Sequence, residues 1–293
     1  MIQTKRVSML RWGIIGVGRA GAARTRAIAA DPRCEAAVGY RGDPEAAGLM
    51  VAESVPALIA AVDAVAVCSP DRTHPILVTE ALEAGRHVVC EFPLAGTEAE
   101  ASKLLDLARE RQRVLHVEHI ELLGSAAGWW RELDIGAVRC GVVTFESARQ
   151  DISATDGGLA RLHRILDILG PPEALRVDIR THAWLSARLR WGEGEVDIEF
   201  RSGPGLSRKT TISLDCAAGS CRQEDRRVFL DDAEVTLPPS PPMFTTDQRF
   251  ATDTILHATP HYLSRSRLLC ALRLRDALSA VDTGSWQGFS PPG

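Results

Sequence analysis

The segment from residue 10 to residue 21 limits the possible folds most strongly. The apolar run LRWGIIG leads directly into a G-x-G-x-x-G motif, and a helical pattern follows over residues 19–30. This strand–turn–helix context turns a weak glycine pattern into a specific one, because the turn lets the backbone approach a pyrophosphate at the helix N-terminus. We therefore predict a dinucleotide site formed by Gly16, Val17, Gly18, Arg19, Ala20 and Gly21.

The first 120 residues alternate between short apolar runs and helical patterns. The other apolar runs cover 34–39, 64–69, 86–90 and 114–117, and the helical patterns cover 73–84 and 97–110. Thr97 and Glu100 form a capping-box pattern at the start of the last helix. Strands that alternate with helices are typical of a parallel, doubly wound sheet, so we predict an α/β Rossmann domain.

The pattern changes in the second half of the chain. Residues 138–147 and 176–201 alternate between apolar and polar side chains, which indicates strands of an antiparallel sheet with one face in water. We expect a helix over 157–169, a proline-rich linker over 236–244 and a final helix over 246–280. We predict an NAD(P)-binding domain over 1–122 and a substrate-binding α+β domain over 123–293. The second domain should have a mostly antiparallel sheet and a C-terminal helix that packs back on the first domain.

Composition narrows the functional classes. The net charge of -4 comes without a basic stripe, which argues against nucleic-acid binding. No run approaches about 18 apolar residues, so we expect no membrane span. The seven cysteines form no CxxC pair and the first ten residues lack an apolar signal-peptide core, so we expect a reducing, cytoplasmic location.

The residues at the end of the second predicted strand indicate whether the site prefers NAD or NADP. NAD sites usually place an acid there for the ribose hydroxyl, whereas this chain has Gly39-Tyr40-Arg41-Gly42. Arg41 can pair with a 2′-phosphate, so we predict NADPH, with NADH as a weaker cofactor. The alternative is a solvated loop arginine, with Asp43 close by.

Cys68 and Ser69 end the strand that should pass the nicotinamide ribose, and His74 follows them. We predict that all three contact the cofactor, although His74 could also be a helix-capping residue. Together with Glu91, at the end of the next strand, they complete the predicted cofactor-binding set.

The stretch from Cys68 to Ala108, CSPDRTHPILVTEALEAGRHVVCEFPLAGTEAEASKLLDLA, resembles the glucose–fructose oxidoreductase and inositol dehydrogenase superfamily. That superfamily usually has Glu-Lys-Pro where this chain has Glu91-Phe92-Pro93. The lysine that its sugar dehydrogenases use beside the nicotinamide is therefore absent.

Within that superfamily the chain resembles the biliverdin reductases. The resemblance lies in GVGRAG (16–21), HVEHIELL (116–123), GGLARLHRILDILG (157–170) and GPGLSRK (203–209). Biliverdin reductases carry Glu-Tyr-Pro at 91–93, so Phe92 departs from the branch and puts the role of that tyrosine in doubt here.

The resemblance implies a reaction. Sugar dehydrogenases place an Asp and a His four residues apart on the helix at 157–169, where this chain has Ala160 and Arg164, so a base for alcohol oxidation is missing. The implied activity is NADPH-dependent reduction of biliverdin to bilirubin, by hydride transfer to the central methine bridge of this tetrapyrrole. It belongs to heme degradation and implies a functional link to a heme oxygenase.

The candidate reaction residues follow from this resemblance. Arg161 matches an arginine that biliverdin reductases keep, and it could bind a propionate or stabilise charge on the pyrrole system; the alternative is a surface arginine. The predicted catalytic residues are Arg161, Glu118 and Phe92, and the predicted substrate-binding residues are Arg161, Arg164, Glu121, Arg208 and Lys209. The cluster of His116, Glu118, His119 and Glu121 is interpreted as a polar floor under the substrate, and no metal is expected.

Two other functions remain open. One is an NADP-dependent dehydrogenase or reductase of the same superfamily that acts on a sugar or an unsaturated ring. The other is a catalytically silent NADP-sensing protein. This alternative stays open because Phe92 replaces the tyrosine of the biliverdin reductases.

Overall fold

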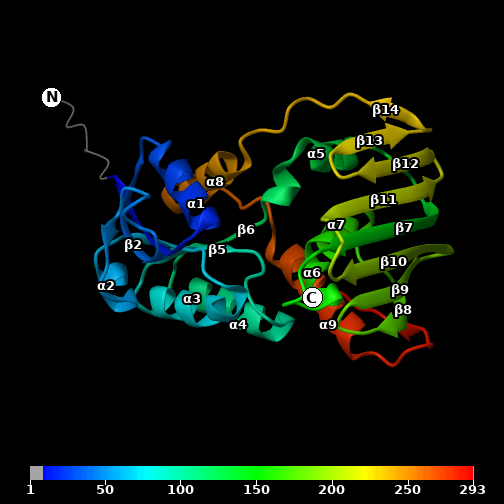
Figure 1. The fold of residues 1–293 in the computed structure, drawn as a ribbon, viewed down its shortest axis with the longest axis horizontal. Coiled ribbons are helices and arrows are strands. Elements are labelled where there is room, and N and C mark those ends of the chain that lie inside the picture. The colour runs from blue at the N-terminus through cyan, green and yellow to red at the C-terminus, as the bar shows by residue number, and fades with distance from the viewer. Residues whose placement is uncertain (1–8, 293) are drawn as a thin grey trace. The chain divides into compact units, whose positions relative to one another are not determined.

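The computed structural model describes residues 9–292, and the chain forms two compact units (Figure 1). Unit 1 comprises Met1–Leu123 and Pro241–Ser264, and unit 2 comprises Gly124–Ser240 and Arg265–Gly293. Each unit is therefore built from two separate stretches of the chain.

Unit 1 is a Rossmann domain, as predicted. Its strands are β1 (Leu10–Val17), β2 (Cys34–Gly42), β3 (Met50–Val51), β4 (Ala64–Val67), β5 (His87–Glu91) and β6 (Leu115–Glu118). They form one parallel sheet in the order β3-β2-β1-β4-β5-β6. This order brings the carboxyl ends of β1 and β4 together, which is where such sheets bind ligands.

Helices cover both faces of this sheet. They are α1 (Arg19–Ala29), α2 (Val55–Ala60), α3 (His74–Glu83), α4 (Glu98–Glu110) and α8 (Met243–His257), with short 3₁₀ turns η1 (Asp71–Thr73) and η2 (Ile120–Leu123). The predicted cap of α4 is present, because the Glu100 amide donates to the Thr97 hydroxyl over 3.2 Å. The sequence did not predict β3 or α2, which are only two and six residues long.

Unit 2 contains a nine-stranded, mostly antiparallel sheet, as predicted. Its strands are β7 (Val138–Ser147), β8 (Ala174–Arg180), β9 (Trp184–Trp191), β10 (Gly194–Ser202), β11 (Lys209–Cys216), β12 (Gly219–Glu224), β13 (Arg227–Leu230), β14 (Ala233–Val235) and β15 (Gln287–Gly288). The sheet order is β14-β13-β12-β11-β7-β10-β9-β8-β15, and of its pairs only β10 with β7 is parallel among the described residues.

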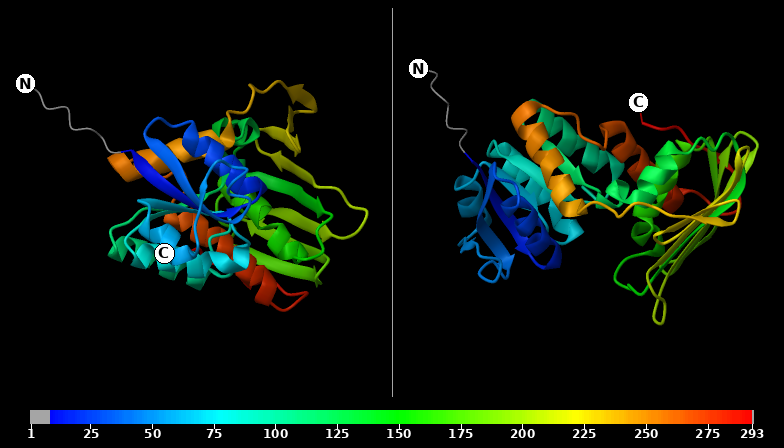
Figure 2. Two further views of the ribbon diagram at one scale, coloured as in Figure 1. Left: turned by 60° about the vertical axis from the view of Figure 1, so that its left-hand side comes forward. Right: turned by 90° about the horizontal axis from the view of Figure 1, so that it is seen from above.

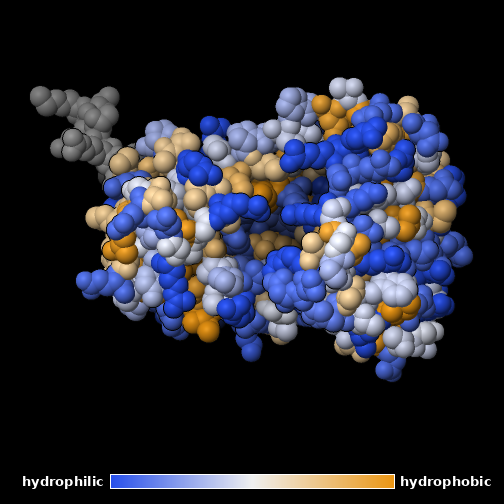
Figure 3. Space-filling model, viewed as in Figure 1, coloured by the Kyte–Doolittle hydropathy of each residue, from blue (hydrophilic) through white to orange (hydrophobic). Residues whose placement is uncertain are grey.

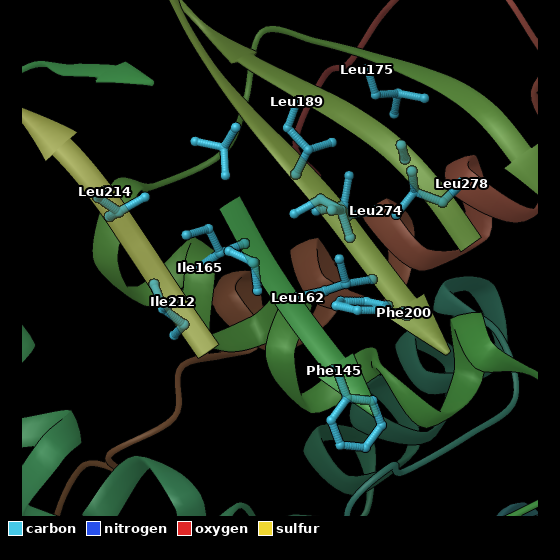
Figure 4. Close-up of a cluster of buried hydrophobic side chains, with 14 of the residues drawn as sticks. Phe145, Leu162, Ile165, Leu175, Leu189, Phe200, Ile212, Leu214, Leu274 and Leu278 are labelled. Carbon is cyan, nitrogen blue, oxygen red and sulfur yellow. The ribbon is translucent and has the colours of Figure 1, made fainter. Parts of the chain in front are cut away.

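Helices pack on one face of this sheet (Figure 2). They are α5 (Ser125–Glu132), α6 (Ala154–Gly157), α7 (Leu159–Leu169) and α9 (Arg265–Ala280). Leu162 and Ile165 of α7 and Leu274 of α9 meet the inward side chains of the strands, such as Phe200 (Figure 4). The alternation of the strands thus builds the core that the sequence predicted.

The outward side chains of the strands are polar, which completes the alternation. Arg188 on β9, for example, donates to Asp197 on β10 over 2.7 Å. Hydrophilic residues predominate over these strands on the face drawn in Figure 3.

Two predicted helices are wrong in extent. The helix expected over 246–280 is two helices, because Ala258 adopts a left-handed φ of 54° and Pro260 follows it. The two helices belong to different units, α8 to unit 1 and α9 to unit 2. The helix expected over 157–169 is divided at Gly158, where a side chain would collide with the Phe200 ring. Among the described residues, no helix combines the length and the apolar character that a bilayer span requires.

Candidate active site

The glycine turn after β1 forms an open cradle. Gly16 has a φ of +94°, and a Cβ there would lie 2.6 Å from the Cys68 carbonyl oxygen; a Cβ on Gly21 would collide with the Gly16 carbonyl. A Cβ on Gly18, by contrast, would have no atom within 4 Å. The turn thus needs its glycines and leaves free space before the N-terminus of α1, which fits a dinucleotide pyrophosphate.

A hollow beside this cradle runs between α1 and the loop after β2. It is lined by Val17, Gly18, Arg19, Ala22, Thr25, Arg26, Asp43, Ala46 and Ala47. Exposed Arg41 stands at the end of β2, with its guanidinium 5.5 Å from the Tyr40 ring centre. Asp43 Oδ1 accepts the Ala46 amide over 3.0 Å, so this carboxylate is already engaged in its own turn. The positive charge of the arginines at this hollow and at the end of β2 therefore favours binding of an anionic group.

His74 links the loops that follow β4 and β5, on the side of the site where the nicotinamide is expected. It is fully buried, with Nε2 2.8 Å from the Ser69 carbonyl and Nδ1 2.8 Å from the Pro93 carbonyl. Both ring nitrogens are therefore engaged with backbone carbonyls. Contact between His74 and the cofactor stays a prediction. Next to it, the Ser69 and Thr73 hydroxyls lie 2.7 Å apart, and Cys68 is partly buried.

A buried charge network lies beneath the carboxyl end of β6. The guanidinium of fully buried Arg24 pairs with Glu118 and, over 2.6 Å, with Asp247 of α8. The other Asp247 oxygen accepts from Tyr262 over 2.7 Å and lies 2.8 Å from His116 Nε2. His116 and Glu118 thus belong to one buried network, in which Glu118 is an ion-pair partner of Arg24. The catalytic role of Glu118 stays a prediction.

The sequence did not identify Asp247 as a residue of this network. Its partner Arg24 is 223 residues away in the chain, and no local pattern marks an acid inside an amphipathic helix as buried. Burial alone would raise its pKa, but His116 and Arg24 outweigh that effect and hold the pKa well below the usual aspartate range.

Glu91 and Glu118 lie side by side at the ends of β5 and β6. Burial, together with the nearby Glu118 charge, raises the pKa of Glu91 to about 7. Burial also raises the pKa of Glu118, but Arg24 opposes that rise. Glu91 Oε1 is buried and has no hydrogen-bond partner among the described residues. Next in the chain, the Phe92 ring lies 4.3 Å from the His119 ring, and Glu121 follows on η2, half-buried.

The two predicted arginines of α7, Arg161 and Arg164, are buried. Arg161 Nε donates to Thr210 Oγ1 over 3.2 Å, and its guanidinium stands 4.6 Å from the Phe145 ring centre. Arg164 donates to Gln223 Oε1 over 3.3 Å. The alternative of a surface arginine at 161 is therefore wrong, because the apolar stripe of α7 turns both guanidiniums toward the sheet.

Arg208 and Lys209 are exposed at the start of β11. Lys209 directly precedes Thr210, the hydrogen-bond partner of Arg161. Unit 2 therefore brings three predicted substrate-binding cations to one end of this strand, while Arg164 lies one helical turn farther along α7.

Comparison with known proteins supports the Rossmann assignment. Residues 10–119 match the family described as "Oxidoreductase family, NAD-binding Rossmann fold". Biliverdin reductase A of Mus musculus is 28% identical over 255 residues, which cover 76% of this chain and 83% of the mouse protein. UDP-N-acetylglucosamine 3-dehydrogenase of Acidithiobacillus ferrooxidans is 34% identical over 137 residues, which cover 44% of this chain and 43% of that protein.

A solved structure shares the fold of the whole chain. Biliverdin reductase from Synechocystis sp. PCC 6803, in complex with biliverdin and NADP+, aligns with a TM-score of 0.82 and 24% identity, over 92% of this chain and 98% of the other. The predicted resemblance is thereby confirmed, and so is the binding of a nicotinamide dinucleotide. The chain is an NAD(P)-dependent oxidoreductase, and its residues 10–119 are similar to the oxidoreductase family with an NAD-binding Rossmann fold.

Proposed function

We propose that the protein reduces biliverdin to bilirubin with NADPH. The observation that carries the proposal is the residue set where related sugar dehydrogenases keep their reacting groups: Phe92 after β5, and Ala160 and Arg164 on α7. None of these can take a proton from an alcohol at neutral pH, whereas reduction of a conjugated tetrapyrrole requires no such base. The match to mouse biliverdin reductase A, over 83% of that protein, supports the same substrate.

In this proposal unit 1 binds the cofactor, which supplies the hydride when bound. The glycine cradle takes the pyrophosphate, and Arg41 with Arg19 takes the 2′-phosphate, because both are cations beside the hollow after β2. The Synechocystis biliverdin reductase structure contains NADP+, which supports the same preference here.

Unit 2 supplies the groups for a substrate with two propionates. Arg161 is held over the Phe145 ring, where its charge can stabilise an electron-rich pyrrole system or a propionate. Arg208 and Lys209 are exposed, so a carboxylate in solution can approach both cations. In unit 1, the half-buried Phe92 ring offers a flat apolar surface and Glu121 a polar one.

The cellular setting follows from the same proposal. A heme oxygenase would supply the bilin, and all seven cysteines are free, which suits a reducing cytoplasm.

The test is anaerobic incubation of the protein with biliverdin and NADPH, followed by visible absorbance. Red absorbance should fall while blue absorbance rises, and NADH should support a slower change. Samples without cofactor or without protein are the controls. A folded protein that binds NADPH but leaves the biliverdin spectrum unchanged would refute the proposal.

A second candidate is a sugar-directed oxidoreductase, which the match to UDP-N-acetylglucosamine 3-dehydrogenase favours for the first half of the chain. Reduction of NADP+ in the presence of a nucleotide sugar would support it. Binding of NADPH with no turnover of either substrate class would favour the sensing role instead.

A further inference from the structure

We propose that Glu91 is the acid that delivers the proton accompanying hydride transfer, and that the neighbouring Glu118 carboxylate helps to keep this proton in place. The inference rests on the proposed function and adds a catalytic residue to it. Phe92 has no hydroxyl, so the proton must come from another group.

Position is the first argument. Glu91 is the last residue of β5, and ligands of doubly wound sheets bind outside the carboxyl ends of the strands. Its Oε1 is buried and has no hydrogen-bond partner among the described residues. A buried carboxylate without a donor is unfavourable, whereas a carboxylic acid carries its own proton and can donate it.

The surrounding charges are the second argument. From β6, Glu118 faces Glu91 and disfavours a second negative charge, and Asp71 of η1 acts in the same direction. From α1, Arg24 acts in the opposite direction, as does the Cys68 thiol after β4. Arg24, however, is already paired with Glu118 and Asp247. Burial, which has the largest effect, and the Glu118 charge together raise the pKa of Glu91 to about 7, close to the optimum for a proton donor at neutral pH.

Other candidate groups are poorer donors. The Tyr262 hydroxyl is committed to Asp247, and burial raises its pKa further. Burial likewise raises the pKa of the Cys68 and Cys90 thiols well above the usual value. Arginine side chains, such as that of Arg161 in unit 2, hold their proton too tightly to donate it near neutral pH.

The proton balance is simple. The central methine carbon gains a hydride, and a pyrrole nitrogen gains the proton as the O–H bond of the Glu91 carboxyl breaks. The resulting carboxylate lies beside Glu118, which favours rapid reprotonation from solvent before the next turnover.

The experiment compares wild type with Glu91→Gln and Glu91→Asp in biliverdin turnover across pH 5.5 to 9. Wild-type kcat should fall above about pH 7 as Glu91 ionises. Glu91→Gln should lower kcat about 10²-fold at pH 6.5 and abolish that fall, because an amide does not titrate. Glu91→Asp should retain the fall at a shifted pH. KM for biliverdin and Kd for NADPH, measured by cofactor fluorescence, should stay within about threefold.

Glu83→Gln is the matched control, since Glu83 is an exposed glutamate at the end of α3; its profile should equal that of wild type. If Glu91→Gln keeps the fall above pH 7, the assignment is overturned. The same holds if His119→Gln, rather than Glu91→Gln, removes it. A wild type that binds NADPH but converts no biliverdin instead refutes the proposed function, so the two failures are distinguishable.

Discussion

Two glutamates on adjacent strands show how position decides chemistry at the scale of single residues. Glu118 pairs with a buried guanidinium, whereas Glu91 is buried beside the Glu118 charge. The sequence predicted Glu118 as catalytic and Glu91 as cofactor-binding. It could not predict the ion pair that distinguishes them, because Arg24 lies on a helix 94 residues from Glu118.

A first prediction concerns stability against pH for Glu91→Gln. The folded pKa of Glu91 is about 7, above the unfolded value of about 4.3. The folded state therefore binds more protons between these values, and this stabilisation is lost as pH rises through 7. Relative to wild type, the variant should gain roughly 1–3 kcal/mol in unfolding free energy between pH 5 and pH 8, measured by urea denaturation. An equal difference at both pH values would contradict the shifted pKa.

A second prediction concerns Arg41→Ala. Loss of a charge-assisted phosphate contact should weaken NADPH binding by about 1.5–3 kcal/mol and leave NADH binding nearly unchanged. Fluorescence titration with both cofactors measures it. Arg111→Ala, an exposed arginine after α4, is the control. Equal losses for both cofactors would remove Arg41 from the 2′-phosphate site.

Arg161 carries a third prediction, which the structure changes. The sequence left open a surface arginine, and loss of an exposed helical arginine would cost under about 0.5 kcal/mol. The side chain is instead buried, bonded to Thr210 and stacked on Phe145. Arg161→Ala should therefore destabilise unit 2 by about 1–3 kcal/mol and also lower kcat on biliverdin about 10²-fold. Urea denaturation and steady-state kinetics separate the effects; parental kcat and KM in a folded variant would exclude Arg161 from the site.

At the scale of elements, local sequence patterns predicted those helices and strands that depend on nearby residues alone. Apart from β3 and α2, the strands and helices of residues 10–118 appear where apolar runs, the glycine motif and the Thr97 cap predict them. The sequence also predicted a C-terminal helix that packs back on the first domain, but not that only the first part of it, α8, belongs to unit 1. Its position depends on Asp247 and on Ala251, which joins the core around Trp12 and Ile28.

A fourth prediction tests how α8 is held. Asp247→Ala leaves Arg24 with a single carboxylate partner and removes the acceptor of His116 and Tyr262, so it should cost about 3–5 kcal/mol of unfolding free energy. Asp253→Ala, on the same helix, breaks only a half-exposed pair with Arg33 and should cost under about 1 kcal/mol. Similar losses of unfolding free energy for the two variants in urea denaturation would show that the buried network stabilises the fold no more than the half-exposed pair.

At the scale of the whole molecule, chain connectivity and structural units do not coincide. The sequence predicted two consecutive domains, 1–122 and 123–293, because composition changes once along the chain. The structure instead returns residues 241–264 to unit 1 and then completes unit 2 with α9. Leu274 and Leu278 of α9 belong to the unit 2 core, so unit 2 is also discontinuous.

The last prediction follows from this connectivity. A fragment of residues 1–123 lacks α8, so Arg24 loses Asp247, and the core surface that Ala251 covers becomes exposed. Loss of one partner of a buried charge and exposed apolar surface together cost several kcal/mol, about the whole stability of a small domain. The fragment should therefore show little cooperative unfolding and bind NADPH at least tenfold more weakly than the full chain, whereas the same fragment joined through a flexible linker to residues 241–264 should recover both properties. Circular dichroism melts and fluorescence titration measure them. Parental NADPH affinity in the 1–123 fragment alone would show that the α8 segment is dispensable for the nucleotide site.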